Sequence, residues 1–461
     1  MIKESDTIAA ISTAVSSAGI GIIRISGPDS VSILHKIFDP YNKKNKSGLE
    51  SHHIYYGYIK DGDEIIDECI VFIMKAPHSY TREDVVEIDC HGGIAVVYRI
   101  MNLVISCGAR TAEPGEFTKR AFLHGRIDLS QAEAVMDLIE SKNESARRNS
   151  LSQLKGKLSE EIKRLRAEIL YEIAYIESAL DDPEHISLEG YPDKLECQAE
   201  SWEESLQKMI DSYDNGRLIS EGIRTCIVGK PNAGKSSILN ALLGEDRAIV
   251  TEIAGTTRDT LEEILTFDGI TLNIIDTAGI RNTSDTVEKI GVEKAKREIE
   301  TADLVLFVID TSTDLTEEDR EIFRNIKGKR KIILMNKSDM PQLISEQDIR
   351  IYLEEEDRVV SVSAKYQRGI EDFMKELKDL LFQGKIHMDH EFYITNVRHK
   401  NLLQESLESI KCLLVSIRDH MPEDFFTIDM MNTYEKLGLI IGESVEDDLV
   451  NEIFSRFCMG K

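Results

Sequence analysis

The sequence predicts a chain of mixed α/β and α class, in which a doubly wound parallel sheet is inserted into a helical domain and follows an N-terminal α+β domain. Three observations predict it. Short strand-like runs fill residues 1–120, apolar residues recur at helical spacing over 151–180 and again over 403–417, and between these two stretches several apolar runs each end in a polar motif. Helical periodicity and strands that end in polar motifs are typical of these architectures.

Length and composition exclude several classes of protein. A chain of 461 residues suggests about three domains. The net charge of −27 argues against general electrostatic binding of nucleic acid, so an RNA contact requires a local patch or a partner protein. The seven scattered cysteines form no C-x-x-C pair and predict a reducing, cytoplasmic location. No signal peptide, and no run of about 18 apolar residues that could cross a membrane, is recognisable.

The first 120 residues read as a small α+β domain. Strands are predicted over 21–26, 68–74 and 84–90, and a helix is predicted over 93–105. Because side chains alternate along a strand, the third strand has two sets of residues, with Val86, Ile88 and Cys90 on one face and Val85, Glu87 and Asp89 on the other.

From about residue 130 the pattern becomes helical. Residues 130–133 (SQAE) form a capping-box pattern for a helix start. Apolar steps of three and four from 151 to 180 predict one long amphipathic helix that ends before Pro183, and a second helix is predicted over 193–213. Since the helical stretch over 403–417 has an apolar stripe of its own, we expect the two helical parts to pack on each other.

Residues 229–236 read GKPNAGKS and lie between the apolar run 223–228 and the helix-like run 237–243. This is the context that a phosphate-binding loop requires, although a plain glycine turn is the alternative. Glycines let successive N–H groups point at an anion, and the helix start adds positive charge. Lys235 would reach the β- and γ-phosphates, and the Ser236 hydroxyl would bind magnesium.

Three further motifs follow apolar runs in the order that GTPases use. DTAG at 276–279 would hold magnesium through water with Asp276 and bond the γ-phosphate with the Gly279 N–H; SAK at 363–365 would back the base. NKSD at 336–339 places Asp339 to accept two hydrogen bonds from guanine. Because losing such a bond leaves a polar group unpaired, at about 1–3 kcal/mol each, Asp339 predicts GTP rather than ATP.

The chain resembles the MnmE (TrmE) family of tRNA-modifying GTPases over essentially its whole length. The resemblance rests on GKPNAGKSS, TEIAGTTRD, DTAGIR and NKSD, and outside that part on GIIRISGP, EPGEFTKRAFLHGRIDLSQAEA and the final CMGK. It implies an N-terminal tetrahydrofolate-binding and dimerisation domain over 1–120, a discontinuous helical domain over 121–218 and 383–461, and an inserted Ras-like GTPase domain over 219–382.

The resemblance also implies an activity. The homodimer would act with a FAD-dependent, MnmG-like partner, in a heterotetramer or larger, to add a carboxymethylaminomethyl-type group to C5 of the wobble uridine of certain tRNAs. The one-carbon unit would come from 5,10-methylene- or 5-formyl-tetrahydrofolate. A ribosome-assembly GTPase switch is the alternative, but it usually carries a basic RNA-binding module after the GTPase domain, whereas here that segment is helical and has acidic stretches such as 443–448.

The family's folate-contacting positions match Arg24, Glu87, Arg126 and Lys461. A carboxylate such as Glu87 suits the donors of a pterin, and Arg24 suits an anionic or carbonyl group. Position 126 is usually lysine in the family, and a guanidinium is not equivalent to an ammonium. A structural ion pair between Arg24 and Glu87 is an equally open alternative. Cys458 either assists the folate chemistry or is an inert buried cysteine.

The resemblance also assigns GTP cleavage. The position that carries the water-orienting glutamine in Ras is Ile280 here, and no arginine finger is evident. The resemblance implies Glu288 as the catalytic residue, although 285–288 has the spacing of a helix cap. It implies Mg²⁺ on Ser236 and Thr257, and K⁺ on Asn232, Thr251, Ile253 and Thr256. The implied GTP contacts are Asn232, Ala233, Gly234, Lys235, Ser236, Ser237, Thr251, Glu252, Ile253, Ala254, Gly255, Thr256, Thr257, Asp276, Thr277, Ala278, Gly279, Asn336, Lys337, Asp339, Ser363, Ala364 and Lys365.

Overall fold

The computed structural model describes residues 6–43, 48–243, 263–267, 270–275, 297–382, 392–443, 447–455, 457 and 460. The chain divides into two compact units. The first comprises Met1–Met136, Gln153–Ala174 and Tyr434–Lys461, and the second comprises Asp137–Ser152 and Tyr175–Thr433. Among the described residues, no helix is both long enough and apolar enough to cross a membrane.

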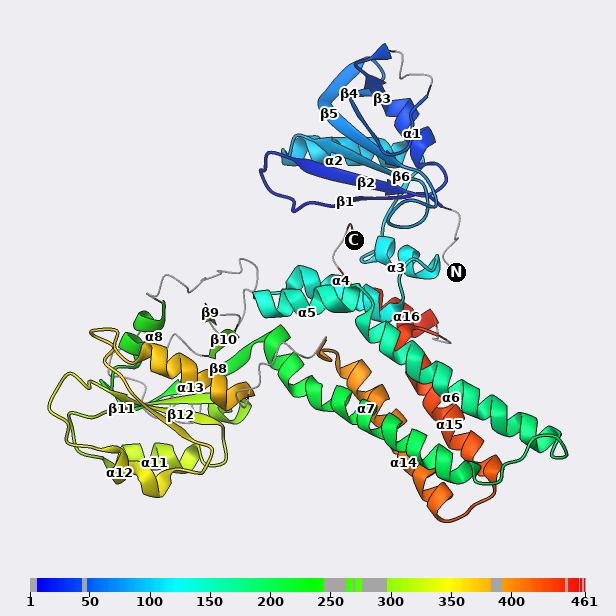
Figure 1. Ribbon diagram of the computed structural model, residues 1–461. Coiled ribbons are helices and arrows are strands. Elements are labelled where there is room, and N and C mark those ends of the chain that lie inside the picture. Colours follow the sequence, from blue (N-terminus) through cyan, green and yellow to red (C-terminus); the bar gives the residue numbers. More distant parts are fainter. Residues whose placement is uncertain are drawn as a thin grey trace. The chain divides into compact units, whose positions relative to one another are not determined.

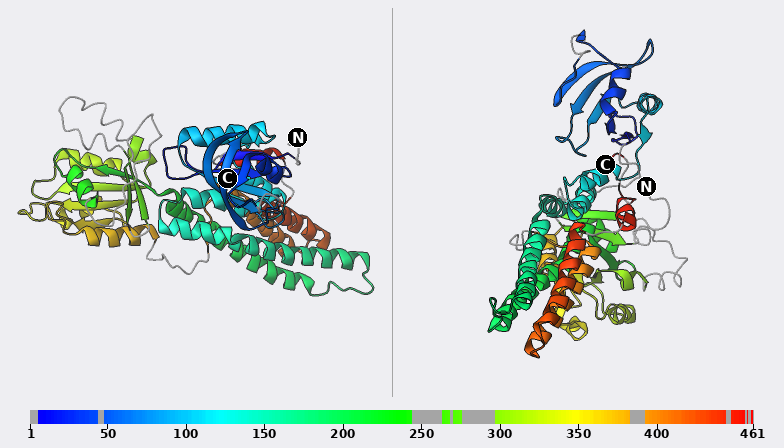
Figure 2. Two further views of the ribbon diagram at one scale, coloured as in Figure 1. Left: turned by 90° about the horizontal axis from the view of Figure 1, so that it is seen from above. Right: turned by 90° about the vertical axis from the view of Figure 1, so that its right-hand side faces the viewer.

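The first unit contains a seven-stranded sheet with the strand order β3-β4-β5-β6-β2-β1-β7. Neighbouring strands are antiparallel except β1 and β7. The strands are β1 (Ile8–Ile11), β2 (Gly21–Ser26), β3 (Phe38–Pro40), β4 (His53–Asp61), β5 (Glu64–Met74), β6 (Val85–Cys90) and β7 (Arg110–Thr111). Helices α1 (Ser30–Ile37) and α2 (Ile94–Ser106) cover one face (Figures 1 and 2).

The core of this sheet lies under α1 and α2. Alternate residues of β6 point into it, namely Val86, Ile88 and Cys90, together with Ile23 and Ile25 of β2. The alternation predicted for this strand is therefore confirmed for the core set. The opposite face of β2 and β6 carries Arg24, Glu87 and Asp89, so the polar residues of these two strands are kept out of the core.

Beyond the sheet and its two helices, the helical parts that belong wholly or partly to the first unit are α3 (Glu116–Leu123), α4 (Leu129–Glu140), the last two residues of α5 (Glu144–Leu154), α6 (Lys157–Asp181), α15 (Glu423–Ile441) and α16 (Asp447–Ser455). The capping box predicted at 130–133 is wrong by two residues. Asp128 Oδ1 accepts from the Gln131 N–H at 3.1 Å, and Gln131 Oε1 accepts from the Asp128 N–H at 3.0 Å. Aspartate and glutamine complete the same reciprocal pair earlier in the chain, which leaves Ser130 inside the first turn.

The apolar stripe over 151–180 belongs to two helices rather than to the one that was predicted. Helix α5 (Glu144–Leu154) ends shortly before Gly156, whose φ is +93°, and α6 then runs to Asp181, before Pro183 as expected. A left-handed residue terminates a helix, and glycine adopts that conformation without steric cost. Periodicity continues across such a break, and so it concealed the interruption.

In the second unit, α7 (Tyr191–Glu221) packs along α14 (Val397–Arg418) (Figure 1). Helix α7 buries Trp202 and Leu206, and α14 buries Leu407 and Ile410. The expectation that the two helical parts pack on each other is confirmed for this pair. Helix α7 runs eight residues beyond its predicted end at 213 and stops before Gly222.

The second unit also contains a six-stranded sheet in the order β13-β12-β11-β8-β10-β9. All neighbours are parallel except β9, which is antiparallel to β10. The strands are β8 (Ile223–Val228), β9 (Glu263–Phe267), β10 (Ile270–Ile275), β11 (Leu304–Asp310), β12 (Lys331–Asn336) and β13 (Arg358–Ser361). The associated helices are α8 (Lys235–Leu243), α11 (Glu317–Asn325), α12 (Glu346–Ile349), the 3₁₀ turn η2 (Arg350–Tyr352) and α13 (Ile370–Phe382).

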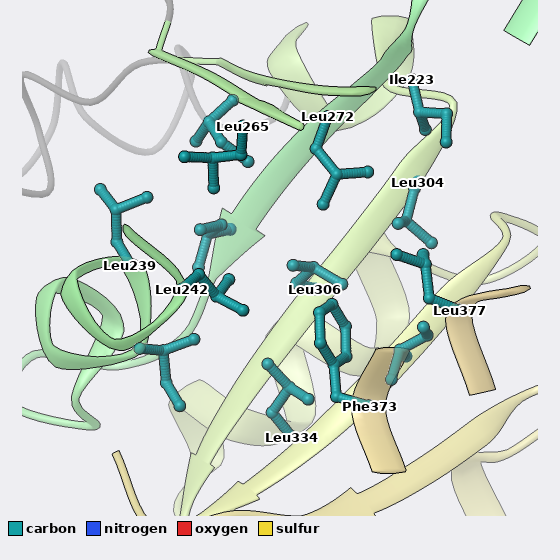
Figure 3. Packing of buried hydrophobic residues seen from close by; sticks show 14 of the residues in the cluster. Ile223, Leu239, Leu242, Leu265, Leu272, Leu304, Leu306, Leu334, Phe373 and Leu377 are labelled. Atoms are coloured by element: carbon teal, nitrogen blue, oxygen red, sulfur yellow. The ribbon is translucent and has the colours of Figure 1, made fainter. Parts of the chain in front are cut away.

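Both faces of this sheet are buried, which explains why its central strands are apolar throughout. Leu304 and Leu306 of β11 pack with α8 and with Phe373 of α13 (Figure 3). The alternate residues Val305 and Phe307 enter a separate cluster on the other face, which includes residues of α11. Helices on both faces leave the carboxyl ends of the parallel strands available for a site.

Two asparagines of the α5 region hold the segments that lead into and out of the six-stranded sheet. Asn143 Nδ2 donates to the Ile219 carbonyl at 3.0 Å and to Thr271 Oγ1 of β10 at 2.9 Å. Asn149 accepts from the Tyr393 N–H at 2.7 Å and donates to its carbonyl at 3.2 Å. The sheet is thereby fastened to the helical part of its own unit through buried side-chain hydrogen bonds.

Candidate functional site

The loop after β8 adopts the strained conformations that a phosphate-binding loop requires. Gly229 has a φ of +151°, and a Cβ there would lie 2.4 Å from the Val308 carbonyl oxygen. Gly234 has a φ of +99°, and a Cβ there would lie 2.1 Å from Asn336 Nδ2. Asn232 between them is also left-handed, at +63°. Such turns of the backbone are typical of anion-binding concavities, and the start of α8 follows directly.

Lys235, the first residue of α8, lies back across this loop. Its ammonium donates to the carbonyls of Gly229, at 2.6 Å, and Lys230, at 3.0 Å. Burial lowers the pKa of Lys235, because the charged form loses solvation. A phosphate in the loop would offer this half-buried ammonium a charged acceptor in place of neutral carbonyls. Ser236 and Ser237 follow in the first turn of the same helix.

One side chain connects three of the predicted motifs. Asn336, at the end of β12, is only 2% exposed. Its Nδ2 donates to the Ala233 carbonyl at 2.9 Å, and its Oδ1 accepts from the Ala364 N–H at 3.2 Å. The phosphate loop, the NKSD motif and the SAK motif are therefore brought to one place by a buried amide. The role of this asparagine as a bridge was not visible in the sequence.

The predicted guanine acceptor is already oriented. Asp339 Oδ1 accepts from the Ser363 hydroxyl at 2.6 Å, and this hydrogen bond lowers the pKa of Asp339. Ser363 is itself fixed by two backbone hydrogen bonds with Arg368. The carboxylate is exposed, so it stays ionised and available as an acceptor. The neighbouring Lys337 is left-handed and pairs with Asp310 Oδ2 at 2.6 Å.

Sequence reasoning missed one contact of the phosphate loop. Lys230 lies 3.2 Å from Asp319 Oδ2, a carboxylate that is fully buried at the start of α11, and it donates to Thr313 Oγ1 at 2.9 Å. The capping box of α11, formed by Thr316 and Asp319, is readable from the letters TEED. That its aspartate also pairs with the loop lysine depends on how β8 and β11 lie side by side.

Several predicted residues lie outside the described residues. They are the switch segment 251–257, the DTAG motif at 276–279, Glu288, Cys458 and Lys461. Of the predicted metal ligands, the structure therefore places Ser236 and Asn232. Lys365 is described and exposed, with its ammonium 5.0 Å from the centre of the Tyr366 ring.

A second candidate site lies on the face of the seven-stranded sheet opposite α1 and α2. Arg24 and Glu87 are opposite each other on β2 and β6, and Arg24 Nε lies 2.6 Å from Glu87 Oε1. Arg24 Nη1 also donates to the Gly460 carbonyl at 3.0 Å. The ion pair considered as an alternative is thus present. The structure also places the predicted arginine, the predicted carboxylate and the end of the chain together.

Aromatic side chains form one wall of this site. The guanidinium of Arg126 lies 4.6 Å from the centre of the Tyr80 ring, and that of Arg24 lies 6.0 Å from the same ring and 5.6 Å from Phe117. Two guanidinium groups therefore approach one tyrosine, which favours an anionic ligand.

Buried ion pairs fix the helix that carries Phe117. Arg120 of α3 lies 2.9 Å from Glu83, 2.8 Å from Asp6 and 3.0 Å from Glu116. Burial by itself would raise the pKa of Glu116, but hydrogen bonds from Arg110 and Arg120 hold it below its usual range. These ion pairs link α3 to Asp6 and Glu83, beside the wall that Tyr80 and Phe117 form.

Comparison with known proteins assigns the chain to a family. The model described as the MnmE helical domain matches residues 129–458, and the model described as the GTP-binding protein TrmE N-terminus matches residues 7–126. A protein of Lachnoclostridium phytofermentans named tRNA modification GTPase MnmE is 55% identical, over 99% of this chain and 100% of its own length. The chain belongs to the MnmE family.

Other members carry the same name. MnmE proteins of Thermoanaerobacter pseudethanolicus and Clostridioides difficile are 46% and 45% identical, each over 99% of this chain and 99% of their own length. Among solved structures, the G domain of the T. maritima FeoB iron transporter is 23% identical and covers 34% of this chain and 98% of its own, with a TM-score of 0.26. The MnmE helical-domain match encloses the whole six-stranded sheet and its site.

Proposed function

We propose that the chain is a GTP-hydrolysing enzyme that acts in the modification of tRNA. The observation that carries the proposal is the buried Asn336, whose amide bonds both the phosphate loop and the SAK motif. A phosphate-binding element and the base-recognising pair of Asp339 and Ser363 thereby form one nucleotide site. Membership of a family whose relatives are named tRNA modification GTPases supports the same reaction.

Within this proposal each motif has its own task. Lys235 exchanges its carbonyl partners for the β- and γ-phosphates, and Asp339 accepts the two donors of guanine. Ser236 and Thr257 hold Mg²⁺, and Asn232, Thr251, Ile253 and Thr256 hold K⁺. The hard oxygen donors of these residues and of their backbone carbonyls suit both ions. Glu288 orients the attacking water, because the Ile280 side chain has no polar group that could do so.

The first unit is proposed to bind a tetrahydrofolate, independently of GTP. The residues proposed to contact it are Arg24, Glu87, Arg126 and Lys461. The residues present fit such a group: two guanidiniums and an aromatic ring suit its anionic glutamate tail, and carboxylates suit its pterin donors. A bound folate supplies a one-carbon unit. The homodimer and a FAD-dependent, MnmG-like partner complete the proposal, with the wobble uridine as the position that is modified.

The proposal is tested by profiling the nucleosides of tRNA from cells that lack this protein. Loss of the 5-substituted wobble uridine, restored by the wild-type gene and not by one encoding Asp339→Asn, supports a nucleotide-dependent role. An unchanged nucleoside profile in the deletion strain would refute the modification function. If the purified protein hydrolyses GTP but the nucleoside profile is unchanged, the protein is a GTPase that acts in another process.

A further inference from the structure

One carboxylate on the face of the seven-stranded sheet opposite α1 and α2 has a buried oxygen without a hydrogen-bond partner. Asp89 Oδ1 is buried and makes no hydrogen bond within the described part of the chain. The residues in register with Asp89 on the two neighbouring strands are Ile22 of β2 and Ile70 of β5. Cross-strand neighbours share a face of the sheet, so the side chains on either side of this carboxylate are apolar and offer no donor.

Such a group is costly in a folded protein. Burial raises the pKa of Asp89, and the negative charge of Glu87 raises it further. Asp89 as a whole is half-buried, but its Oδ1 is withdrawn from water without a donor and loses hydration that nothing replaces. Native proteins leave few buried polar groups in this condition. Carboxyl groups in this state are concentrated at functional sites.

The neighbouring carboxylate is in a different situation. Glu87 stands two residues earlier on β6, on the same face, about 7 Å away. It is paired with Arg24, whose guanidinium also reaches the Gly460 carbonyl and approaches Tyr80. On this face Glu87 is therefore paired with an arginine, whereas the Oδ1 atom of the neighbouring Asp89 accepts no hydrogen bond.

We propose that Asp89 is a ligand-contacting residue of the folate site and that its Oδ1 accepts a hydrogen bond from the pterin ring N–H or amino group. The inference rests on the proposed folate binding and adds a residue to it. A pterin is a flat ring with adjacent donors, so Ile22 and Ile70 supply apolar contact while Asp89 supplies the acceptor. Arg126, whose guanidinium lies against the Tyr80 ring, remains available for the anionic tail.

The test is a calorimetric titration of the full-length Asp89→Asn variant with 5-formyltetrahydrofolate. We expect affinity about tenfold below that of the wild type, because a neutral amide replaces the charged acceptor and its NH₂ group can face a pterin donor. GTP affinity should not change. The melting temperature of the ligand-free variant should equal or exceed that of the wild type, since a half-buried negative charge beside Glu87 has been removed. Asp63→Asn, in the exposed turn between β4 and β5, is the matched control and should bind folate normally.

The outcomes separate the inference from the function on which it rests. If the wild type does not bind 5-formyltetrahydrofolate, the proposed folate function fails and this inference fails with it. If the wild type binds and Asp89→Asn binds equally well, the inference alone is overturned. If Asp89→Asn melts lower and also loses GTP binding, Asp89 has a structural role and the inference is again wrong. Asp89→Ser, which is smaller, repeats the comparison if the asparagine variant does not fold.

Discussion

Replacing Asp339 by asparagine should convert the preference for guanine into one for xanthine. The Ser363 hydroxyl donates to Asp339 Oδ1, and Ser363 is fixed by its backbone bonds to Arg368. In the variant this hydroxyl holds the amide oxygen in the Oδ1 position, so the NH₂ group takes the place of Oδ2. One acceptor for guanine becomes a donor that faces a donor, whereas the 2-oxo group of xanthine would accept from it.

The expected magnitude follows from that single exchange. A hydrogen bond to a charged group is worth about 1.5–3 kcal/mol, and an unpaired donor adds a desolvation cost of similar size. The two costs together are about 3–6 kcal/mol, so the affinity for GTP should fall by about 10²- to 10⁴-fold, at 1.4 kcal/mol for each factor of ten. Displacement of a fluorescent guanine nucleotide by GTP, XTP and ATP measures all three affinities, and Asp372→Asn on the exposed start of α13 is the control. A variant that still prefers GTP to XTP would refute the assignment of Asp339.

Further predictions concern the catalyst, the folate site and the buried amides. Glu288→Ala should reduce the GTPase rate strongly with little change in GTP affinity, as for a group that acts in the transition state; a helix cap would instead cost about 0.5–2 kcal/mol of stability and leave turnover normal. GTP hydrolysis should be faster in potassium than in sodium at equal ionic strength, and a rate insensitive to that exchange would contradict the cation site. Glu87→Ala should abolish binding of 5-formyltetrahydrofolate and leave GTP binding intact, as two calorimetric titrations would show; equal folate affinity would reject the site. Asn149→Ala leaves the Tyr393 N–H and carbonyl without their partners and should lower the free energy of unfolding by about 1–3 kcal/mol in urea, whereas Ser145→Ala on the same helix should not.

The amino-acid sequence by itself determined the features that depend only on residues close together in the chain. The phosphate loop, the NKSD motif and the SAK motif are each short, and each follows an apolar run that became a strand, β8, β12 and β13. The alternation along β6 could be read in the same way, since a period of two is a property of the backbone itself. The end of α6 before Pro183 is equally local, because proline restricts the residue before it.

Local sequence patterns predicted the wrong helix boundaries at two places. The stripe over 151–180 continued in phase across Gly156, so periodicity alone could not reveal that α5 ends there. At the start of α4 the sequence was read as a capping box at 130–133, but the reciprocal hydrogen bonds form between Asp128 and Gln131, two residues earlier. In both places the decision depends on which backbone groups find partners in the folded chain.

Only the tertiary structure decided which distant residues meet. Asn336 reaches Ala233 across about a hundred residues of sequence, and Lys230 reaches Asp319 because parallel pairing puts β8 beside β11. Arg24 meets Gly460 from the opposite end of the chain. Asp89 shows this dependence most clearly. The sequence places it on the same strand face as Glu87, but its lack of a partner follows from the register that sets Ile22 and Ile70 beside it. Register is a property of paired strands, and a single strand does not contain it.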